Sequence, residues 1–566
     1  MKSTFVSLLS LAATALGAPS PVLEDRGTEV SVKLSSTGDN IVGSSLLNVD
    51  SFRGIPFADN PTGALRLRPP QRLSRKLGTF DATPIAPACP QMLISRDTLG
   101  LVGGVLNDLT NLPFLANVTG REDCLSVTVQ RPTGTKKGDK LPVLFWIFGG
   151  GFELGSTSTY DGTSLLAEAS KQNQDFVYVA VNYRIAGFGF MNGKEILEDG
   201  AANLGLLDQR MGLQWVADNI ADFGGDPDKV TIWGESAGAI SVWDQMALYG
   251  GDANYKGKPL FRGAIMNSGS LVPADPVDCP KGQAVYDAVV DHAGCSGSSD
   301  TLNCLREVDY NTFLSAVNSV PGLLGYQSVA LSYLPRPDGV ILPDTPNNLA
   351  RDGRYHAVPM IVGDQEDEGT LFALFQPNLT TADKVVDYFS KYFFTSASKD
   401  QLNRLVRSYR PYISGGSPHR TLLLNEWYPG FKRLAALLGD LTFTLTRRLF
   451  LEATVKANPE VPSWSYLSSY NYGTPIMGTF HGSDLLQTFY GLLPNNAARS
   501  TRTYYYNFLH NLDPNVGVDK YDTWPEWKEK KDLMWFERPN RNSILRDDFR
   551  QDSYEVIQEL ETVLLI

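Results

Sequence analysis

The stretch that constrains the fold most is Lys229–Gly238, which reads KVTIWGESAG. Its β-branched residues predict a short strand, and the small residues that follow predict the start of a helix. Between them stands Ser236, flanked on each side by a glycine two positions away. Glycines permit a tight strand-to-helix turn that a Cβ would obstruct, and the helix N-terminus favours developing negative charge. The segment therefore indicates an α/β fold with Ser236 as a candidate nucleophile.

Apolar runs elsewhere in the chain predict further strands of a parallel sheet. Residues 141–148 and 175–184 are nearly continuous apolar runs, as strands covered on both faces require. The other predicted elements are an opening β-ribbon over 28–60, strands over 262–268, 355–363 and 463–467, and a helix over 209–221. No linker rich in proline and serine divides the chain. We therefore expect residues 18–566 to form one domain with a large, mostly parallel central sheet and helices on both faces.

The first residues have the pattern of a secretory signal peptide. Lys2 precedes an apolar run over 5–13 and small residues over 15–18. We expect residues 1–17 to be removed, with cleavage after Gly17 or Ala18, and the mature protein to be secreted and extracellular. No later run is apolar enough to span a bilayer, so no transmembrane segment is expected.

The charge of the chain bears on its partners. The formal net charge is −12, and the sequence has no basic stripe. Both features argue against a nucleic-acid partner, and the charge also argues against electrostatic attraction to anionic membranes.

Cysteines and sequons suit an extracellular protein. The chain has five cysteines, an odd number: Cys89, Cys124, Cys279, Cys295 and Cys304. The last two are close enough in sequence to clip a small loop, and a bridge between the first two would contribute about 3–4 kcal/mol by chain entropy. Cys279 is then left over, with no function that the sequence indicates. Asn117 and Asn378 begin N-glycosylation sequons.

The segment between Cys89 and Cys124 has mixed helical character. Apolar residues recur within it at helical spacing: Leu99, Val102, Leu106 and Leu109. Three interior glycines make it a poor helix by propensity. A buried helix under a loop is one interpretation, and a mobile amphipathic flap is the other.

A nucleophilic serine needs a base, and histidine is the usual one at neutral pH. Any single histidine is more often structural, and the chain holds five: His292, His356, His419, His481 and His510. His481 lies in a glycine-rich turn after the predicted strand 463–467. Because catalytic groups gather in loops after parallel strands, His481 is the strongest candidate.

The base in turn needs a carboxylate to fix its tautomer. Residues 363–370 follow a predicted strand and offer four acids: Asp364, Glu366, Asp367 and Glu368. Spacing does not choose among them, and a solvated acidic turn would explain some. The order nucleophile, acid, histidine is the one expected of α/β-hydrolases.

A tetrahedral oxyanion needs backbone N–H donors. Ala237 follows the nucleophile directly, and Gly149–Gly151 follow the predicted strand 141–148. The alternative, a phosphate-binding loop, lacks the residues that complete such motifs.

Several stretches, taken in order, resemble the type B carboxylesterase/lipase family. They are residues 52–58, 122–125, 149–152, 234–238, 367–370 and 478–481. Residues 146–153 and 363–365 are most similar to secreted fungal lipases of the Candida rugosa type. The match spans nearly the whole mature chain, although Cys279 and the glycine-rich flap depart from the family pattern.

The resemblance implies an α/β-hydrolase fold with Glu368 as the acid beside Ser236 and His481. It also implies oxyanion donors at Gly150, Gly151 and Ala237. The implied bridges are Cys89–Cys124 and Cys295–Cys304, with a lid over the site within residues 89–124.

The sequence therefore predicts a secreted serine ester hydrolase that acts on lipids such as triacylglycerols through an acyl-enzyme. No metal or cofactor is implied, and the lid predicts transient contact with a lipid–water interface. The runner-up is a carboxylesterase for soluble short-chain or aromatic esters, or a sterol esterase. A non-catalytic binding protein on the same fold is a remote alternative, since such proteins lose the triad. Acyl-chain length and oligomeric state are not predicted.

Overall fold

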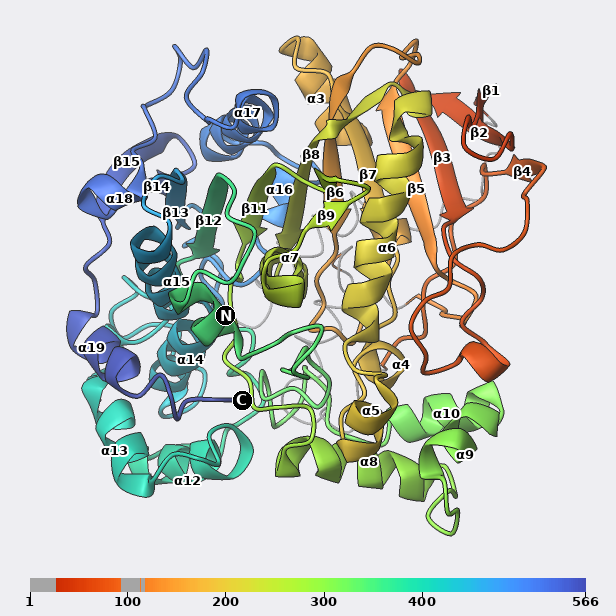
Figure 1. Cartoon of the computed structure of the whole chain (residues 1–566). Helices are drawn as coiled ribbons and strands as arrows, with labels where there is room; N and C mark the ends of the chain where they lie inside the picture. Colours follow the sequence, from red (N-terminus) through yellow and green to blue (C-terminus); the bar gives the residue numbers. More distant parts are fainter. Residues whose placement is uncertain (1–26, 93–111, 113–117) are drawn as a thin grey trace.

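A computed structural model describes residues 27–92, 112 and 118–566 of the chain (Figure 1). One extended sheet runs through this part of the molecule in the order β1-β2-β3-β5-β7-β6-β8-β11-β12-β13-β14-β15, with β4 beside β2. The strands are β1 (Thr28–Lys33), β2 (Asn40–Leu46), β3 (Val49–Pro56), β4 (Thr79–Asp81), β5 (Ser126–Pro132), β6 (Leu141–Ile147), β7 (Val177–Val181), β8 (Gly225–Glu235), β11 (Gly263–Asn267), β12 (Met360–Gln365), β13 (Ser463–Ser468), β14 (Asp532–Arg538) and β15 (Arg541–Arg546).

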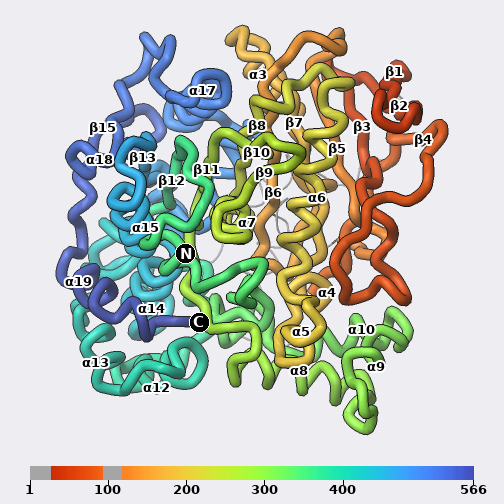
Figure 2. The backbone as a smooth tube through the Cα atoms, viewed as in Figure 1, coloured from red at the N-terminus to blue at the C-terminus, as the bar shows by residue number. Residues whose placement is uncertain are grey.

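The centre of the sheet is parallel and its edges are antiparallel. Every pair from β7 through β6, β8, β11, β12 and β13 to β14 is parallel. The opening ribbon β1-β2-β3 and the closing pair β14-β15 are antiparallel. Figure 2 shows the N-terminal strands at one side of the molecule and the C-terminal strands at the other. The sequence predicted a largely parallel sheet from apolar strands that alternate with helices, and this prediction is confirmed.

Helices cover both faces of this sheet. Leu144 of β6 lies with Leu165 of α3 and Leu509 of α17 around one small internal cavity. The opposite face of β7 meets α6, where a Cβ on Gly212 would stand 2.7 Å from Val181. In Figure 1, α6 and α7 lie in front of the strands. The main helices are α3 (Thr163–Lys171), α6 (Leu204–Asn219), α7 (Ala237–Ala247), α8 (Pro280–His292), α12 (Ala382–Tyr392), α13 (Lys399–Ser408), α14 (Phe431–Gly439), α15 (Leu445–Ala457), α17 (Asn496–Asn511) and α19 (Gln551–Glu559).

One predicted strand is shorter than the sequence suggested. The apolar segment 355–363 becomes strand only from Met360, and His356 lies before it. Pro359 has no N–H to give to a ladder, and the His356 N–H donates to the carbonyl of Met246 at the end of α7, 2.7 Å away. The predicted start of this strand at residue 355 was wrong for this reason.

Parts of the sequence predictions fall outside the described residues. These are the signal peptide 1–17, the lid residues Leu99, Val102, Leu106 and Leu109, and the sequon residue Asn117. Within the described ranges, no helix combines the length and the apolar character needed to cross a membrane.

Candidate active site

Ser236 stands at the junction of β8 and α7, as the sequence predicted. Its backbone has φ 57° and ψ −127°, a conformation that costs a non-glycine residue about 1–3 kcal/mol. The flanking glycines make room for it, because a Cβ on Gly234 would lie 2.2 Å from the carbonyl oxygen of Gly238, and one on Gly238 would lie 2.0 Å from that of Ile147. Any larger residue would therefore push the strand and the helix apart.

The histidine nearest to this serine is His481, from the loop after β13. Its Nε2 lies 2.8 Å from the Ser236 Oγ, and its Nδ1 lies 2.5 Å from Oε2 of Glu368, in the loop after β12. All three side chains are buried. An imidazole that donates its Nδ1 proton to Glu368 leaves a lone pair on Nε2 to accept the proton of the serine.

The four acids of residues 363–370 have different partners. Asp364 accepts a hydrogen bond from the Nε of Arg447 at 2.9 Å, and Glu366 forms an ion pair with Arg420 at 2.5 Å. Asp367 accepts hydrogen bonds from backbone and hydroxyl groups. Of the four, Glu368 is the acid that contacts the imidazole of His481.

Asp367 joins the two loops that carry Glu368 and His481. Its Oδ2 accepts the N–H of Thr479 at 2.9 Å, and its own N–H donates to the Thr479 carbonyl at 3.0 Å. Its Oδ1 accepts the N–H of His419 at 2.7 Å. These bonds fix the distance between the acid loop and the histidine loop, so the position of the imidazole depends on both.

The remaining histidines lie elsewhere. His292 is exposed near Ser315, His356 approaches the carbonyl of Phe261, His419 approaches Arg550, and His510 is at the end of α17. The geometry therefore singles out His481 among the five.

The glycine loop after β6 lies against the serine. A Cβ on Gly149 would stand 2.9 Å from the Cβ of Ser236. Gly150 and Gly151 have φ of 108° and 64°, values that L side chains rarely adopt. Gly151 and Ala237 line the same cavity as Ser236. Two of the three predicted oxyanion donors thus border the space in front of the serine, and the third, Gly150, is adjacent in the chain.

Buried acids raise the pKa of His481. Burial, the largest single effect, lowers that pKa, and the surrounding carboxylates together raise it above its usual value, Glu368 the most. Burial likewise raises the pKa of Glu235 to about 8 and that of Asp484 to about 6. Near neutral pH Glu235 therefore holds a proton, and its Oε1 lies 3.5 Å from the His481 Nε2.

Sequence reasoning missed several residues around the imidazole. The ring centroids of Phe372 and Phe443 lie 5.0 and 4.6 Å from that of His481. Glu235 and Asp484 were not assigned either, although each stands within three positions of a predicted residue. Glu235 directly precedes the nucleophile at the buried end of β8, and this position was the signal available.

A mostly apolar cavity opens from Ser236. Polar side chains on its wall are those of Ser236, Asp244 and Thr442. The apolar lining comes from several elements: Phe152, Ile240, Val272, Leu323, Val329, Leu331, Leu334, Pro335, Pro346, Phe372, Phe443 and the C-terminal Ile566. Such a wall suits a hydrocarbon group attached to the atom that Ser236 attacks.

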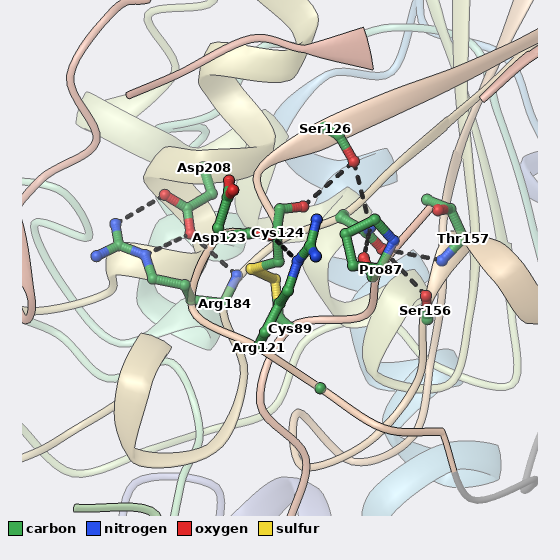
Figure 3. The surroundings of a disulfide bond; sticks show 12 residues. Pro87, Cys89, Arg121, Asp123, Cys124, Ser126, Ser156, Thr157, Arg184 and Asp208 are labelled. Atoms are coloured by element: carbon green, nitrogen blue, oxygen red, sulfur yellow. Dashed lines mark hydrogen bonds and ion pairs between the residues drawn. A yellow bond between two sulfur atoms is a disulfide. The ribbon is translucent and has the colours of Figure 1, made fainter. Parts of the chain in front are cut away.

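Two disulfides brace the chain. Cys89 is bonded to Cys124, and Cys295 to Cys304, while Cys279 is free and buried. Figure 3 shows the first bridge beside the buried ion pair of Arg184 and Asp208. The Nη2 of Arg184 lies 2.8 Å from the Oδ1 of Asp208.

Two further points concern the predicted glycosylation site Asn378 and metal binding. Asn378 is exposed, and its Nδ2 donates to the hydroxyl of Tyr326. Across the described ranges, no group of three or more histidine, cysteine or acidic side chains is placed to hold a metal ion.

Comparisons with known proteins agree with this picture. The sequence model described as "Carboxylesterase family" matches residues 31–556. The chain is 68% identical to "Secreted triacylglycerol lipase LIP1" of Gibberella zeae, over 95% of this chain and 91% of that protein. It is 41% identical to "Lipase 2" of Diutina rugosa, over 97% and 98% of the two chains. A crystal structure of Aspergillus niger EstA superposes with a TM-score of 0.79 at 27% identity, over 95% of this chain and 99% of that one.

Proposed function

The chain belongs to the carboxylesterase family and is a carboxylic ester hydrolase, and from that premise we propose that it is a secreted lipase in which Ser236, His481 and Glu368 form the catalytic triad. The observation that carries the proposal is the continuous contact from the Ser236 Oγ through the imidazole to Glu368, at 2.8 and 2.5 Å. The α/β-hydrolase fold and the family resemblance expected from the sequence are confirmed.

The reaction begins with attack of the Ser236 Oγ on the ester carbonyl carbon. The Nε2 of His481 takes the hydroxyl proton, and Glu368 stabilises the imidazolium that forms. When the tetrahedral intermediate collapses, His481 returns this proton to the departing alcohol and an acyl-enzyme remains. Water then attacks the acyl carbon by the same steps, which releases the carboxylic acid and restores the serine.

The negative oxygen of each intermediate is stabilised by the N–H groups of Gly150, Gly151 and Ala237. Loss of one such donor typically costs about 3–4 kcal/mol of transition-state stabilisation. Ala237 also begins α7, so the positive end of that helix faces the same oxygen. The glycine loop and the helix together supply these donors without a metal ion.

We infer that the acyl part of the substrate is a lipid chain. The apolar cavity that begins at Ser236 supports this, as do the relatives, which are named as lipases. Triacylglycerols are the substrate class that one relative's name gives.

The proposed contact with a lipid surface has support outside the predicted lid. Leu422, Leu423 and Leu424 are consecutive, and each side chain is 71% exposed. Runs of exposed leucine are unusual on a soluble protein and are typical of interaction surfaces. The buried Lys432 holds this turn by donating to the carbonyls of Leu422 and Leu424, at 2.9 and 3.3 Å. The turn begins three residues after His419, whose N–H donates to Asp367, so it lies close to the acid loop of the site.

The chemistry is tested with Ser236→Ala. We expect this variant to fold and to lose ester hydrolysis, and a fluorophosphonate probe to label the wild-type protein but not the variant. Substantial turnover by Ser236→Ala would exclude the mechanism. A non-catalytic binding protein would show neither labelling nor turnover in the wild type.

The surface contact is tested by replacing Leu422, Leu423 and Leu424 together with serine. Hydrolysis of emulsified triacylglycerol should fall several-fold, because each leucine that enters an oil phase contributes about 1.5–3 kcal/mol. Hydrolysis of dissolved nitrophenyl butyrate should stay unchanged. The matched control replaces Leu47, in the turn between β2 and β3, and Ile85, in the loop after β4; they are 73% and 76% exposed, and their replacement should affect neither substrate. Equal loss on both substrates would favour a carboxylesterase for soluble esters.

A further inference from the structure

One face of α7 forms a wall of the cavity that begins at Ser236. Ala237, Ile240 and Asp244 all line it, and their spacing of three and four positions places them on one side of the helix. At a rise of 1.5 Å per residue, Asp244 lies about 10 Å further along the wall than Ala237. An acyl chain attached to Ser236 and lying along this face would pass Asp244 with its middle carbons.

Asp244 is an unusual residue for such a wall. Its side chain is fully buried, and neither carboxyl oxygen has a hydrogen-bond partner among the described residues. A buried polar group without a partner ordinarily destabilises a protein, so it is seldom found without a reason. Asp244 and Thr442 are the polar side chains of the wall that take no part in the proposed catalysis. Of these two, Asp244 belongs to α7, the helix that follows Ser236.

The surroundings of the carboxyl group favour its neutral form. Burial raises the pKa of Asp244 well above its usual value. A neutral carboxylic acid has one O–H to donate and oxygens that accept. It can therefore bond to a hydroxyl, which donates and accepts, or to an epoxide, which only accepts.

The neighbouring wall is apolar and well fixed. Ile566 lines the same cavity, and its carbonyl oxygen accepts from the Arg336 Nη1 at 2.7 Å while its N–H donates to the Pro273 carbonyl at 3.0 Å. Because the remaining wall offers little polar surface, an oxygen on the acyl chain that entered this cavity would lose its bonds to water unless Asp244 replaced them.

We propose that Asp244 binds an oxygen substituent in the middle of the acyl chain, a hydroxyl or an epoxide, and so makes esters of mid-chain oxygenated fatty acids preferred substrates. The inference rests on the proposed function, because it takes the acyl group to lie in the cavity that begins at Ser236. It adds a specificity residue and a substrate class to that function.

The test uses nitrophenyl esters of stearic acid and of its isomers with a single hydroxyl at successive carbons along the middle of the chain, in detergent micelles. The measured quantity is kcat/KM for each hydroxylated ester divided by kcat/KM for the stearate. In the wild type this ratio should peak for a mid-chain isomer, at about 2- to 10-fold above the isomers on either side.

Two variants identify the residue responsible. Asp244→Leu, similar in size and apolar, should abolish the peak, whereas Asp244→Asn, which still donates and accepts, should keep most of it. A flat series in the wild type, or a peak that survives in Asp244→Leu, would overturn the proposal. An equal change for all esters in Asp244→Leu would also overturn it, since Asp244 would then serve only the packing of α7.

The butyrate ester separates this proposal from the one on which it rests. Its chain is too short to reach Asp244, so its hydrolysis reports on the triad and not on the bond between Asp244 and the acyl chain. Failure of the wild type on butyrate and stearate alike would contradict the proposed function instead. Butyrate hydrolysis by the variants also shows that they are folded.

Discussion

Replacing Glu368 with glutamine tests the proposed triad at the point that the sequence left open. Oε1 of Glu368 accepts the N–H of Gln365 at 2.7 Å, and Oε2 faces the Nδ1 of His481 at 2.5 Å. In Glu368→Gln the amide oxygen must stay with the Gln365 N–H, which is buried and needs an acceptor. The amide NH₂ is then turned toward Nδ1 and can only donate to it.

This arrangement forces the wrong tautomer on His481. With Nδ1 accepting a hydrogen bond, the proton moves to Nε2, which can no longer accept the proton of Ser236. In a triad, the same change from carboxylate to amide lowers kcat by about 10⁴-fold. That loss corresponds to about 5.4 kcal/mol of transition-state stabilisation.

The pH profile should change as well. Burial lowers the pKa of His481, and the Glu368 carboxylate makes the largest contribution among the groups that raise it. Without that charge the pKa falls, and because the histidine acts in its neutral form, the acid limb of the residual kcat/KM should move to lower pH. A stopped assay with nitrophenyl butyrate across pH would measure both effects.

Glu366→Gln is the matched control. It is the same substitution in the same loop, but Glu366 pairs with Arg420 and does not contact His481. We expect its kcat and its acid limb to stay close to the wild type. The assignment of the acid would be refuted if Glu368→Gln kept more than about a hundredth of the wild-type kcat, where a 10⁴-fold loss is expected, or if Glu366→Gln lost as much.

Two other substitutions test the surroundings of the serine, one through packing and one through the protonation of a buried acid. Gly238→Ala places a Cβ 2.0 Å from the Ile147 carbonyl and should lower the free energy of unfolding by at least about 1–3 kcal/mol, along with kcat. Urea unfolding measures this effect against Gly297→Ala, where the added Cβ meets open space, and equal midpoints would contradict the packing argument. Glu235 has its pKa raised from 4.5 to about 8, so the folded state holds a proton that the unfolded state releases, and stability should decline as pH rises across that window. Glu235→Gln should make the decline shallower in unfolding experiments from acid to alkaline pH, and an unchanged slope would show that Glu235 is ionised when buried.

The sequence determined the local structures because their causes are local. The β-branched residues before Gly234 and the small ones after Gly238 specify a strand, a turn and a helix, and the apolar run 141–148 specifies a buried strand. The order in which the strands carry serine, acid and histidine is the one expected of α/β-hydrolases, and the resemblance to the type B carboxylesterase/lipase family implied that fold. Residues 93–111 lie outside the described part, so the lid stays a prediction.

Other features depend on contacts between distant segments. Spacing could not choose among the four acids of residues 363–370, because all of them lie at or within three positions of the end of the strand. Only the approach of the histidine loop made Glu368 the partner of His481. Asp244 looks in the sequence like an ordinary helical aspartate, and only the packing around α7 removes it from water and leaves it without a partner. The chain's local chemistry specified which groups are available. The burial and the meeting of segments far apart in sequence decided which protons they hold and which side chains they touch.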